Sequence, residues 1–487
     1  MNRPNNPYPH RASSALSGTE WSQARGAGIV ADLAPGADSL VNRLKLLVVV
    51  GLYIALFLWA YATILAPNFG SEGFALTWPG WGAMVWLMTV ALLPVLILPY
   101  SLSRPSGLFL FWIYLVTYIP SILVPALSLT MPFEELLPLQ TTLLVCMGFL
   151  CMASSARLLA VRQTPLCPAL FWPAFWLVWG ACLGFIVMSA GAGHLVGNLV
   201  SLFEGATEYT IRSLYREEVV EAGRSLAYVV GQFGGALNLF LIAFGLVYRR
   251  RMCLVTGIIG QVSVFSLTGF KAAVLSPIFL AFIALLIKHS RRSFGLALAS
   301  GLMGIILISA IADHASGNIF FSSILTRRAL AVPGLLTGFY FEHYSHFAQV
   351  GPGFHFSHDL AGLGPASEIG FVYMGSEDTA ANANLWAEGF AEFGISGMVG
   401  YTIFVAFVMW IYDSISARHN LALAVLLAAM PAILLSNTAP TTMLISHGSL
   451  AAALVLYFAP SPEPVDGFES ETEPEEGPLL STAETSV

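Results

Sequence analysis

The sequence predicts an all-α membrane protein, a polytopic transmembrane helical bundle of about 12 spans with two large extracytoplasmic loops. Of the 487 residues, 56% are hydrophobic and only 10% are charged, whereas a soluble globular protein carries roughly 25% charged residues. Apolar runs long enough to cross a bilayer recur from residue 44 onwards. The composition therefore argues against a soluble enzyme, and the apolar runs indicate the architecture.

The two ends of the chain differ from its apolar middle. Residues 1–43 are mostly polar or small, and we expect a cytoplasmic N-terminus followed by an uncleaved anchor. Residues 460–487 hold eight acids and no Lys or Arg, so the net charge of −7 becomes +1 without these eight charges. We expect this proline-broken segment to be a disordered cytoplasmic tail. The five cysteines lie in or beside apolar runs, which argues against a disulfide framework.

A helix needs about 20 apolar residues to cross a hydrocarbon core ~30 Å thick. Twelve stretches meet or approach this length, and together they form a predicted transmembrane domain over residues 44–459. The shortest two, joined at Gly269-Phe270-Lys271, could instead be one re-entrant pair. The twelve stretches are 44–66, 80–101, 107–129, 139–160, 168–190, 225–248, 252–269, 271–287, 293–313, 386–412, 419–436 and 441–459.

Lys and Arg favour the cytoplasmic loops of membrane proteins. Alternate loops of the predicted bundle are basic, such as Arg249–Arg251 and the segment from Lys288 to Arg292. The short loops between them hold no Lys or Arg; these are 67–79, 130–138 and 437–440. We therefore expect both termini inside, and two long segments, about 191–224 and 314–385, outside. Loops of this length are usually functional or disordered, and these two have features of packed structure.

The first outer loop carries two arginines at helical spacing. Arg212 and Arg216 are four residues apart and would share one helix face, where an anion between them would remove their repulsion. The guanidinium fork suits phosphate because it donates two parallel hydrogen bonds. The alternative is a solvated helix in which nearby glutamates pair with the arginines; these are Glu208, Glu218 and Glu221.

The second outer loop combines a basic pair with candidate proton acceptors. Arg327 and Arg328 precede an aromatic stretch that contains Glu342, His343 and His346. If the loop folds back, an anion clamp and a general base would meet, as transfer chemistry on a phosphate-activated substrate requires. One alternative is that the arginines are topological anchors and the histidines pack among aromatic rings. Another is a zinc site, for which further ligands would be His355, His358 and Asp359.

Three further residues stand at the outer ends of predicted spans. Lys271 begins a span, where it either faces a cavity or extends to the interface. Asn384 is predicted to be the N-cap of the tenth span. Glu388 and Glu392 share one face near the start of that span, and either line a cavity or pair with loop arginines.

Several of these segments together resemble a known family. An arginine is followed by Val-Pro-Gly-Leu-Leu (332–336) and an aromatic run, then by Asn-x-Asn (382–384) and Ala-Glu-Phe-Gly-x-x-Gly (391–397). Ser-Leu-Thr-Gly-Phe-Lys (266–271) precedes a span. These motifs and the topology resemble the O-antigen polymerase and ligase superfamily, and are most similar to its Wzy-type oligosaccharide repeat-unit polymerases.

The resemblance implies an inverting, metal-independent glycosyltransferase of GT-C type that uses no cofactor. Its substrates would be undecaprenyl-diphosphate-linked oligosaccharides in the plasma membrane of a bacterium. One lipid-linked glycan is moved onto the non-reducing end of another, which builds a surface polysaccharide such as O-antigen, capsule or exopolysaccharide. The implied protein partners are a flippase and a chain-length regulator, and nucleic acid is not an expected partner.

The resemblance also gives the candidate residues their roles. The groups that would hold a diphosphate are Arg327 or Arg328, Lys271, and Arg212 or Arg216. The candidate bases that would deprotonate the acceptor hydroxyl are Glu342 and His343. The supporting residues are His346, Asn384 and Glu388. Electrostatic stabilisation of the leaving diphosphate is the physical basis of such a mechanism.

Three other functions compete with polymerisation. A transporter or flippase for lipid-linked glycan usually builds its site at the membrane midplane from interrupted helices, whereas the charged residues here gather in outer loops. A ligase of the same superfamily usually has a His-x-His-Asn-like motif, and the segment 342–346 lacks the Asn. A non-catalytic scaffold does not explain structured, arginine-bearing outer loops.

Overall fold

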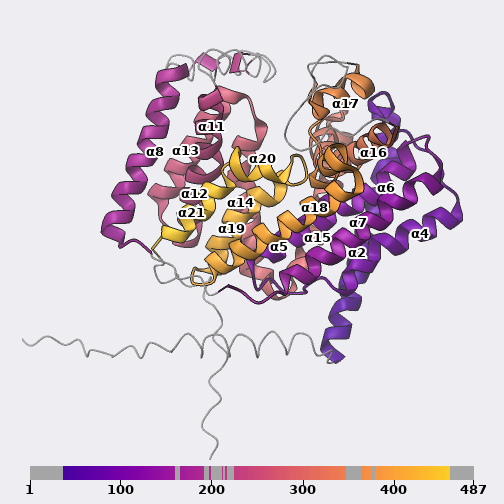
Figure 1. Cartoon of the computed structure of the whole chain (residues 1–487), viewed down its shortest axis with the longest axis horizontal. Helices are drawn as coiled ribbons and strands as arrows, with labels where there is room; N and C mark the ends of the chain where they lie inside the picture. The colour runs from indigo at the N-terminus through magenta and orange to yellow at the C-terminus, as the bar shows by residue number, and fades with distance from the viewer. Residues whose placement is uncertain are drawn as a thin grey trace, which may run out of the picture.

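The computed structural model describes residues 37–159, 165–190, 197–198, 211, 214–215, 224–346, 364–375 and 379–460. All regular secondary structure in these residues is helical (Figure 1). Eight of the described helices are long and apolar enough to cross a membrane, judged by length and composition. The chain is therefore a multi-pass helical membrane protein, as the sequence predicts.

The helices follow one another with short connections, and several contain π-helical or 3-10 segments. In chain order they are α2 (Ala37–Ala60), η1 (Tyr61–Leu65), α3 (Ala66–Phe69), η2 (Gly70–Glu72), α4 (Trp81–Leu92), η3 (Leu93–Leu96), α5 (Pro105–Trp112), η4 (Ile113–Tyr118), α6 (Ile119–Ser128), α7 (Phe133–Ser154), α8 (Pro168–Ala190), α11 (Arg224–Gln232), η5 (Phe233–Leu237), α12 (Asn238–Val247), α13 (Arg251–Thr268), α14 (Lys271–Ser290), η6 (Arg291–Ser293), α15 (Phe294–Ser316), η7 (Ser322–Ala331), α16 (Val332–His346), α17 (Pro365–Met374), α18 (Leu385–Ser416), α19 (Leu421–Leu434), α20 (Pro440–Ile445) and α21 (Ser449–Phe458).

Each of the twelve stretches predicted to span the membrane contains helix, but the helices differ in length. The apolar stretch Lys271–Ser316 divides at η6 into α14 and α15. Three apolar segments are shorter than the rest; they are Trp81–Leu96, Leu421–Leu434 and Ser449–Phe458. A helix of 14 residues, such as α19, covers only about 21 Å of a hydrocarbon core ~30 Å thick. The number of complete crossings thus stays a prediction.

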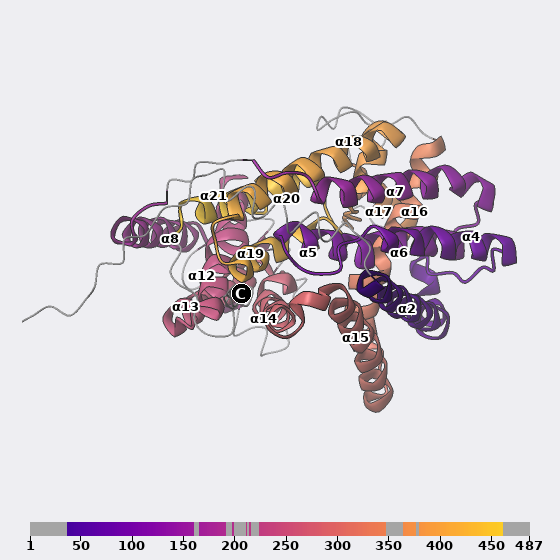
Figure 2. The same ribbon diagram turned by 90° about the horizontal axis from the view of Figure 1, so that it is seen from below.

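The helix from Pro105 to Ser128 is the centre of the bundle, and its apolar stretch is completely buried. Its tyrosines satisfy their hydroxyls internally, because an unsatisfied polar group away from water costs several kcal/mol. Tyr114 and Tyr118 each donate a hydrogen bond of 2.8 Å to a backbone carbonyl near the end of α4. Seen from below in Figure 2, α4, α6, α7 and α18 lie in one half of the molecule, and α8, α12 and α13 lie in the other.

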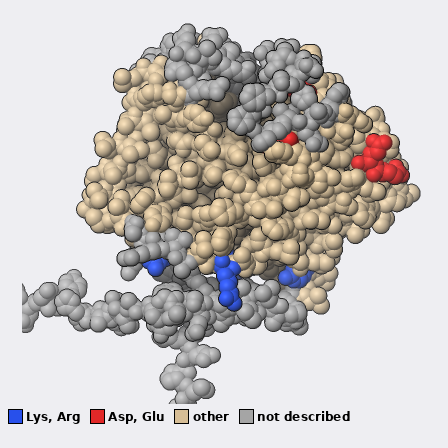
Figure 3. Space-filling view, viewed as in Figure 1, with Lys and Arg blue, Asp and Glu red and all other residues tan. Residues whose placement is uncertain are grey.

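Basic side chains on the visible face of the molecule lie along its lower edge (Figure 3). Arg104 donates to the carbonyl of Ser154 at 3.0 Å, and Arg291 donates to the carbonyl of Leu102 at 3.2 Å. Acidic side chains on the visible face lie at its right-hand edge and near its top (Figure 3). We call the end with Arg104 and Arg291 the lower end, and the opposite end, where Figure 1 shows α17, the upper end.

Lys271 begins α14 at the upper end, because α14 leads down to η6 and Arg291. Gly269, which ends α13, has a φ of 63°, a conformation that favours glycine. The helices on either side have 18 and 20 residues and cover about 27 and 30 Å. Their lengths favour two separate spans over a re-entrant pair.

The range expected to be the second outer loop contains a long packed helix. The π-helix η7 continues directly into α16, and every residue from Pro333 to Phe341 is buried. α16 packs against α6 and α18, and η7 packs against α15 and η1. Gly334 allows the close approach to α6, since a Cβ there would overlap the backbone of Pro120. The segment 322–346 is therefore part of the bundle and not a surface loop.

A glycine pair joins α11 and η5 to the turn before α21. Gly231 and Gly235 are four residues apart, and a Cβ on either would overlap the carbonyl oxygen of Ser446 or His447. Overpacking of this kind typically costs 1–3 kcal/mol. We expect Gly235→Ala to lower the melting temperature of the purified protein, measured by size-exclusion chromatography after heating. Gly51→Ala is the matched control, because that helical glycine faces open space; equal melting temperatures for both variants would contradict the packing argument.

Candidate functional site

A group of hydrogen-bonded polar side chains joins the end of α16 to α17 at the upper end. We call it the Glu342 cluster, and its members are Glu342, His343, Tyr344, Glu368 and Tyr373. The Tyr373 hydroxyl donates to Glu342 Oε2 at 2.9 Å. His343 Nε2 lies 2.8 Å from Glu368 Oε1, and the Tyr344 hydroxyl donates to Glu368 Oε2 at 2.8 Å. Two carboxylates from different helices are thus each held by tyrosine.

Helix geometry explains how these residues meet. Glu342, His343 and Tyr344 are consecutive on α16 and point about 100° apart around its axis. α17 begins with Pro365 after Gly364, which suits the first turn of a helix. Its Tyr373 ring stacks on Phe339 of α16 with centroids 4.2 Å apart. This stacking and the Glu368 bonds fix α17 on α16.

The members of the cluster differ in solvent exposure, and this difference distinguishes a group that can contact substrate from groups that only hold the cluster together. Glu368 and His343 are buried, with 2% and 6% of their surface exposed. Glu342 is only half-buried. Burial, and beyond it the negative charge of Glu342, raises the pKa of Tyr373 above its ordinary value, so this hydroxyl stays protonated and donates. Glu342 is therefore the carboxylate that a substrate can reach.

Asn384 has the structural role that the sequence predicts for it. Its side-chain oxygen accepts hydrogen bonds from the backbone of Trp386 and Ala387 at the start of α18, which confirms the N-cap. Its amide nitrogen donates to Thr337 Oγ1 at 2.7 Å and to the Pro333 carbonyl at 3.0 Å. Asn384 is fully buried and ties α18 to α16.

Glu388 lies one turn into α18 and extends this polar junction. Its Oε1 accepts a hydrogen bond from the backbone of Ala383 at 3.3 Å, with the Tyr340 hydroxyl at 3.5 Å. Glu392 accepts a hydrogen bond of 2.7 Å from Tyr401 on the same helix. Glu388 therefore contacts the backbone just before α18 and a side chain of α16, so it supports the arrangement of these two helices.

Arg327 and Arg328, which the sequence does not distinguish, have different surroundings. Arg327 forms an ion pair with Glu72, lies 4.3 Å above the centre of the Phe69 ring, and donates to Ser323 Oγ at 3.0 Å. Its side chain is only 18% exposed, whereas Arg328 is exposed. The structure thus holds one guanidinium in a fixed position.

The predicted meeting of these arginines with Glu342 and His343 does not occur. The expectation required the chain to fold back between them, but η7 and α16 form one continuous helix. Fifteen residues of helix separate Arg327 from Glu342 by about 20 Å. The two ends of the η7–α16 helix therefore form two sites, and Arg327 cannot act on the same atoms as Glu342.

Lys271 lies beside a described part of the first outer loop. The ring of Tyr215 packs edge-on against Phe270 with centroids 6.2 Å apart, and both Tyr215 and Ile211 are buried. Tyr215 precedes Arg216 in the sequence, and Phe270 precedes Lys271. Arg212 and Arg216 themselves lie outside the described residues. The contact nevertheless connects this loop to the turn that carries Lys271.

The remaining histidine expectations concern the end of α16 and the segment after it. His346 is the last residue of α16 and is exposed. The other ligands of the zinc alternative lie outside the described residues; they are His355, His358 and Asp359. Within the described part of the chain, no three His, Cys, Asp or Glu side chains come together as a metal-binding group.

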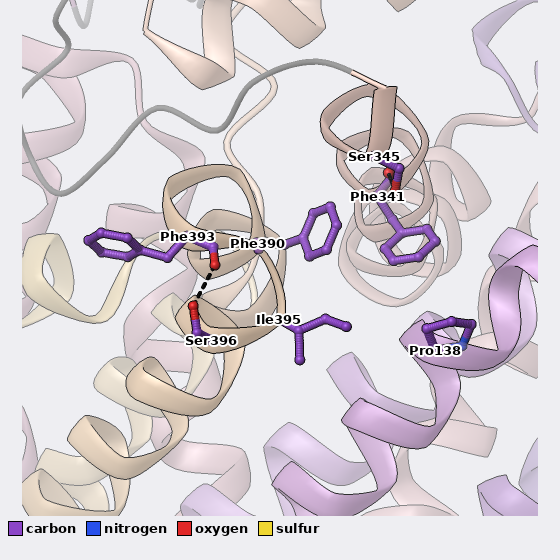
Figure 4. A pocket seen from close by; sticks show the side chains of 8 residues that line it. Pro138, Phe341, Ser345, Phe390, Phe393, Ile395 and Ser396 are labelled. Atoms are coloured by element: carbon purple, nitrogen blue, oxygen red, sulfur yellow. Dashed lines mark hydrogen bonds between the residues drawn. The ribbon is translucent and has the colours of Figure 1, made fainter.

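A pocket of about 380 Å³ opens next to the Glu342 cluster, between α7, the end of α16 and a kink in α18 (Figure 4). The kink lies at Phe393 and Gly394, and Gly394 has a φ of 63° and a ψ of −144°. The rings of Phe341 and Phe390 are 4.8 Å apart between centroids. The other lining residues are Pro138, Ser345, Ile395 and Ser396. This mostly apolar lining suits a hydrocarbon chain better than a diphosphate.

Glu368 is a member of the cluster that the sequence does not predict. It lies 25 residues after His343, within the range expected to be a loop. Pro365 at the first helical position and an acid in the first turn are typical of a helix start. These signals predict a helix there, but they do not predict its contact with His343.

Comparisons of the chain with protein-family models, with curated proteins and with solved structures found no match. The features of this membrane protein that bear on its function are the Glu342 cluster, the fixed Arg327 and the turn that carries Lys271.

Proposed function

We propose that this protein is a glycosyltransferase that polymerises lipid-linked oligosaccharide repeat units, the activity that its motifs resemble. The observation that carries the proposal is the half-buried Glu342, held by Tyr373 at the end of the bundle opposite the basic residues. Because Lys and Arg favour the cytoplasmic side, the upper end would face outward from the plasma membrane of a bacterium. That is the side on which such polymers are built.

Glu342 would be the general base of the reaction. One of its oxygens accepts the Tyr373 hydrogen bond, and the carboxylate keeps further lone pairs for a hydroxyl of the acceptor sugar. A base must come within about 2.6–3.2 Å of the proton that it removes. His343, the other candidate, is buried against Glu368, so we assign it a positioning role.

The reaction itself forms one carbon–oxygen bond, breaks another, and moves one proton. The acceptor oxygen attacks the anomeric carbon of the donor, while the bond from that carbon to the diphosphate oxygen breaks with inversion. The proton passes to Glu342, and the lipid diphosphate leaves with the electron pair. Cations that stabilise this developing charge supply most of the rate enhancement. Lys271 and the arginines of the adjoining first loop are the groups to which we assign this stabilisation of the leaving diphosphate.

A polymerase holds two lipid-linked molecules at once, and this gives Arg327 a separate role. The reacting hydroxyl of the acceptor lies at its non-reducing end, whereas its diphosphate lies at the opposite end of the repeat unit. The groups that bind the two must be separated by an oligosaccharide. Arg327 lies about 20 Å along the helix from Glu342, and we assign it to the diphosphate of the acceptor. The apolar pocket beside Phe341 and Phe390 would take a hydrocarbon chain.

The test uses the full-length protein in proteoliposomes, with lipid-linked repeat units supplied on one face only. We expect glycans whose lengths increase by whole repeat units when the substrate is on the face of the upper end. Substrate that crosses the bilayer without becoming longer would indicate a flippase and contradict the proposal. Vesicles without the protein are the control for spontaneous exchange.

A further inference from the structure

A second pocket lies at the upper end beside η7, at the Arg327 end of the η7–α16 helix. It has a volume of about 420 Å³, within the range of ~300–1,000 Å³ that is usual for small-molecule sites. Four segments line it: the helix end that contains Asn68, the end of α15, the connection after α15, and the start of η7. We call it the Asp313 pocket, and its lining residues are Ile64, Asn68, Ala310, Asp313, His314, Gly317, Asn318, Ile319 and Ser322.

The polar groups of the Asp313 pocket include both donors and acceptors. Each oxygen of Asp313 accepts one backbone N–H of η7 or the residue before it, at 2.7 Å, and keeps a lone pair for a ligand. Asn318 uses its carbonyl oxygen to accept from Phe320, so its amide nitrogen can donate. Asn68 donates to the Ile64 carbonyl, so its oxygen can accept.

Ser322 supplies an independent sign of a ligand. Its side chain is fully buried and lines the pocket, and its hydroxyl has no hydrogen-bond partner among the described residues. Buried hydroxyl groups in native proteins nearly always have a partner. A ligand hydroxyl bound against this wall of the pocket would provide one once the Ser322 side chain turns toward it.

The lining restricts the chemistry of that ligand. None of the described lining residues is Lys or Arg, so the pocket offers no cation to a phosphate. Asp313 and His314 are its only metal-ligating side chains among these residues, too few for a metal centre. Acceptors and donors beside the apolar side chains of Ile64 and Ile319 suit a neutral molecule with several hydroxyls and a C–H face. That description fits a sugar ring.

The pocket adjoins the place where Arg327 is held. Asn68 lies next to Phe69, over which the Arg327 guanidinium stacks, and Ser322 lies next to Ser323, which accepts its hydrogen bond. Ser322 and Arg327 are five residues apart on a π-helix, so they lie about one turn from each other. A sugar in the pocket would therefore lie beside the guanidinium.

We propose that the Asp313 pocket is a sugar-binding subsite that holds the ring next to the diphosphate bound by Arg327. The identity of that sugar as part of a lipid-linked acceptor rests on the proposed function. The hydroxyls of the ring donate to Asp313 and Asn68 and accept from Asn318 and Ser322. The pocket then selects the first sugar of the repeat unit, while Glu342 acts on the last.

The test measures sugar binding to the full-length protein in lipid nanodiscs by saturation-transfer NMR. The probes are glucose, galactose and N-acetylglucosamine. We expect at least one to bind, and we expect Ser322→Ala and Asn68→Ala each to weaken it by roughly three- to tenfold, the effect of one lost hydrogen bond. Ala310→Phe, which fills the pocket, should abolish binding. Thr63→Ala is the matched control on the same helix, because Thr63 bonds only the carbonyl of Trp59 and does not line the pocket.

Ser322→Ala also separates binding from folding. It removes a hydroxyl without a described partner, so the melting temperature should not fall. Failure of all three sugars to bind, or equal binding by the wild type and Ala310→Phe, would overturn the inference. So would a phospholipid retained by the wild type and lost from Ala310→Phe in native mass spectrometry. If sugars bind in the pocket but no polymer is made, the proposed function is refuted and the subsite stands. If polymer is made but no sugar binds in the pocket, the subsite is refuted and the proposed function stands.

Discussion

Glu342→Gln is expected to reduce the rate of polymer formation by about 10²–10⁴-fold, the usual contribution of general base catalysis. The amide has the shape of the carboxylate and still accepts the Tyr373 hydrogen bond, but it cannot take up the proton of the acceptor hydroxyl. The measurement is the initial rate at which glycans lengthen in proteoliposomes, with the amount of inserted protein determined in parallel.

Glu135→Gln is the matched control for this substitution. Glu135 is an exposed carboxylate in the first turn of α7, so its neutralisation changes the net charge equally without touching the cluster. We expect that variant to polymerise at the wild-type rate. A Glu342→Gln protein that also lengthens glycans at the wild-type rate would exclude Glu342 as the base.

Arg327→Ala is expected to raise the KM for the lipid-linked acceptor by about ten- to hundredfold, because hydrogen bonds to charged groups are worth roughly 1.5–3 kcal/mol. Arg327→Lys should recover only part of this loss, since an ammonium cannot donate two parallel hydrogen bonds to phosphate. Arg328→Ala should stay near the wild type, because Arg328 is exposed. KM and kcat are measured from the dependence of the lengthening rate on acceptor concentration.

A purely structural role for Arg327 has its own control. Glu72→Gln breaks the same ion pair but leaves the guanidinium over the Phe69 ring. If the ion pair only stabilised the fold, Glu72→Gln and Arg327→Ala would reduce activity equally. If Arg327 binds diphosphate, Glu72→Gln should retain activity. Equal effects of Arg327→Ala and Arg328→Ala would also argue against a specific role for Arg327.

The membrane helices were predictable because an uninterrupted apolar run of about 20 residues is typical of a membrane span. The predicted stretch 168–190 coincides with α8, Pro168–Ala190. The same rule does not predict the η7–α16 helix, because neighbouring helices bury this helix and its sequence is less apolar. Arginines, Glu342 and two histidines interrupt it, and hydroxyl-bearing aromatic residues replace the aliphatic side chains of a typical span. A rule based on apolar runs therefore classifies such a helix as a loop.

The candidate site was also predictable only in part. The N-cap role of Asn384 was predictable, because capping depends on the next three residues. The pairing of Glu368 with His343 was not, since it depends on how α17 packs against α16. The expected approach of Arg327 to Glu342 assumed a flexible connection, and the continuous helix between them excludes it. Local capping signals are present in the sequence, whereas contacts between helices depend on tertiary packing.

In the polymerase that we propose, the continuous η7–α16 helix would also set a minimum length for the acceptor. A packed helix does not shorten to suit a small substrate, so the interval between Arg327 and Glu342 is fixed by the number of residues between them. A lipid-linked monosaccharide could reach one of these groups but not both. Only an acceptor at least as long as this interval would be held by its diphosphate and presented to the base, so the proposed polymerase would select its acceptor by the number of its sugars.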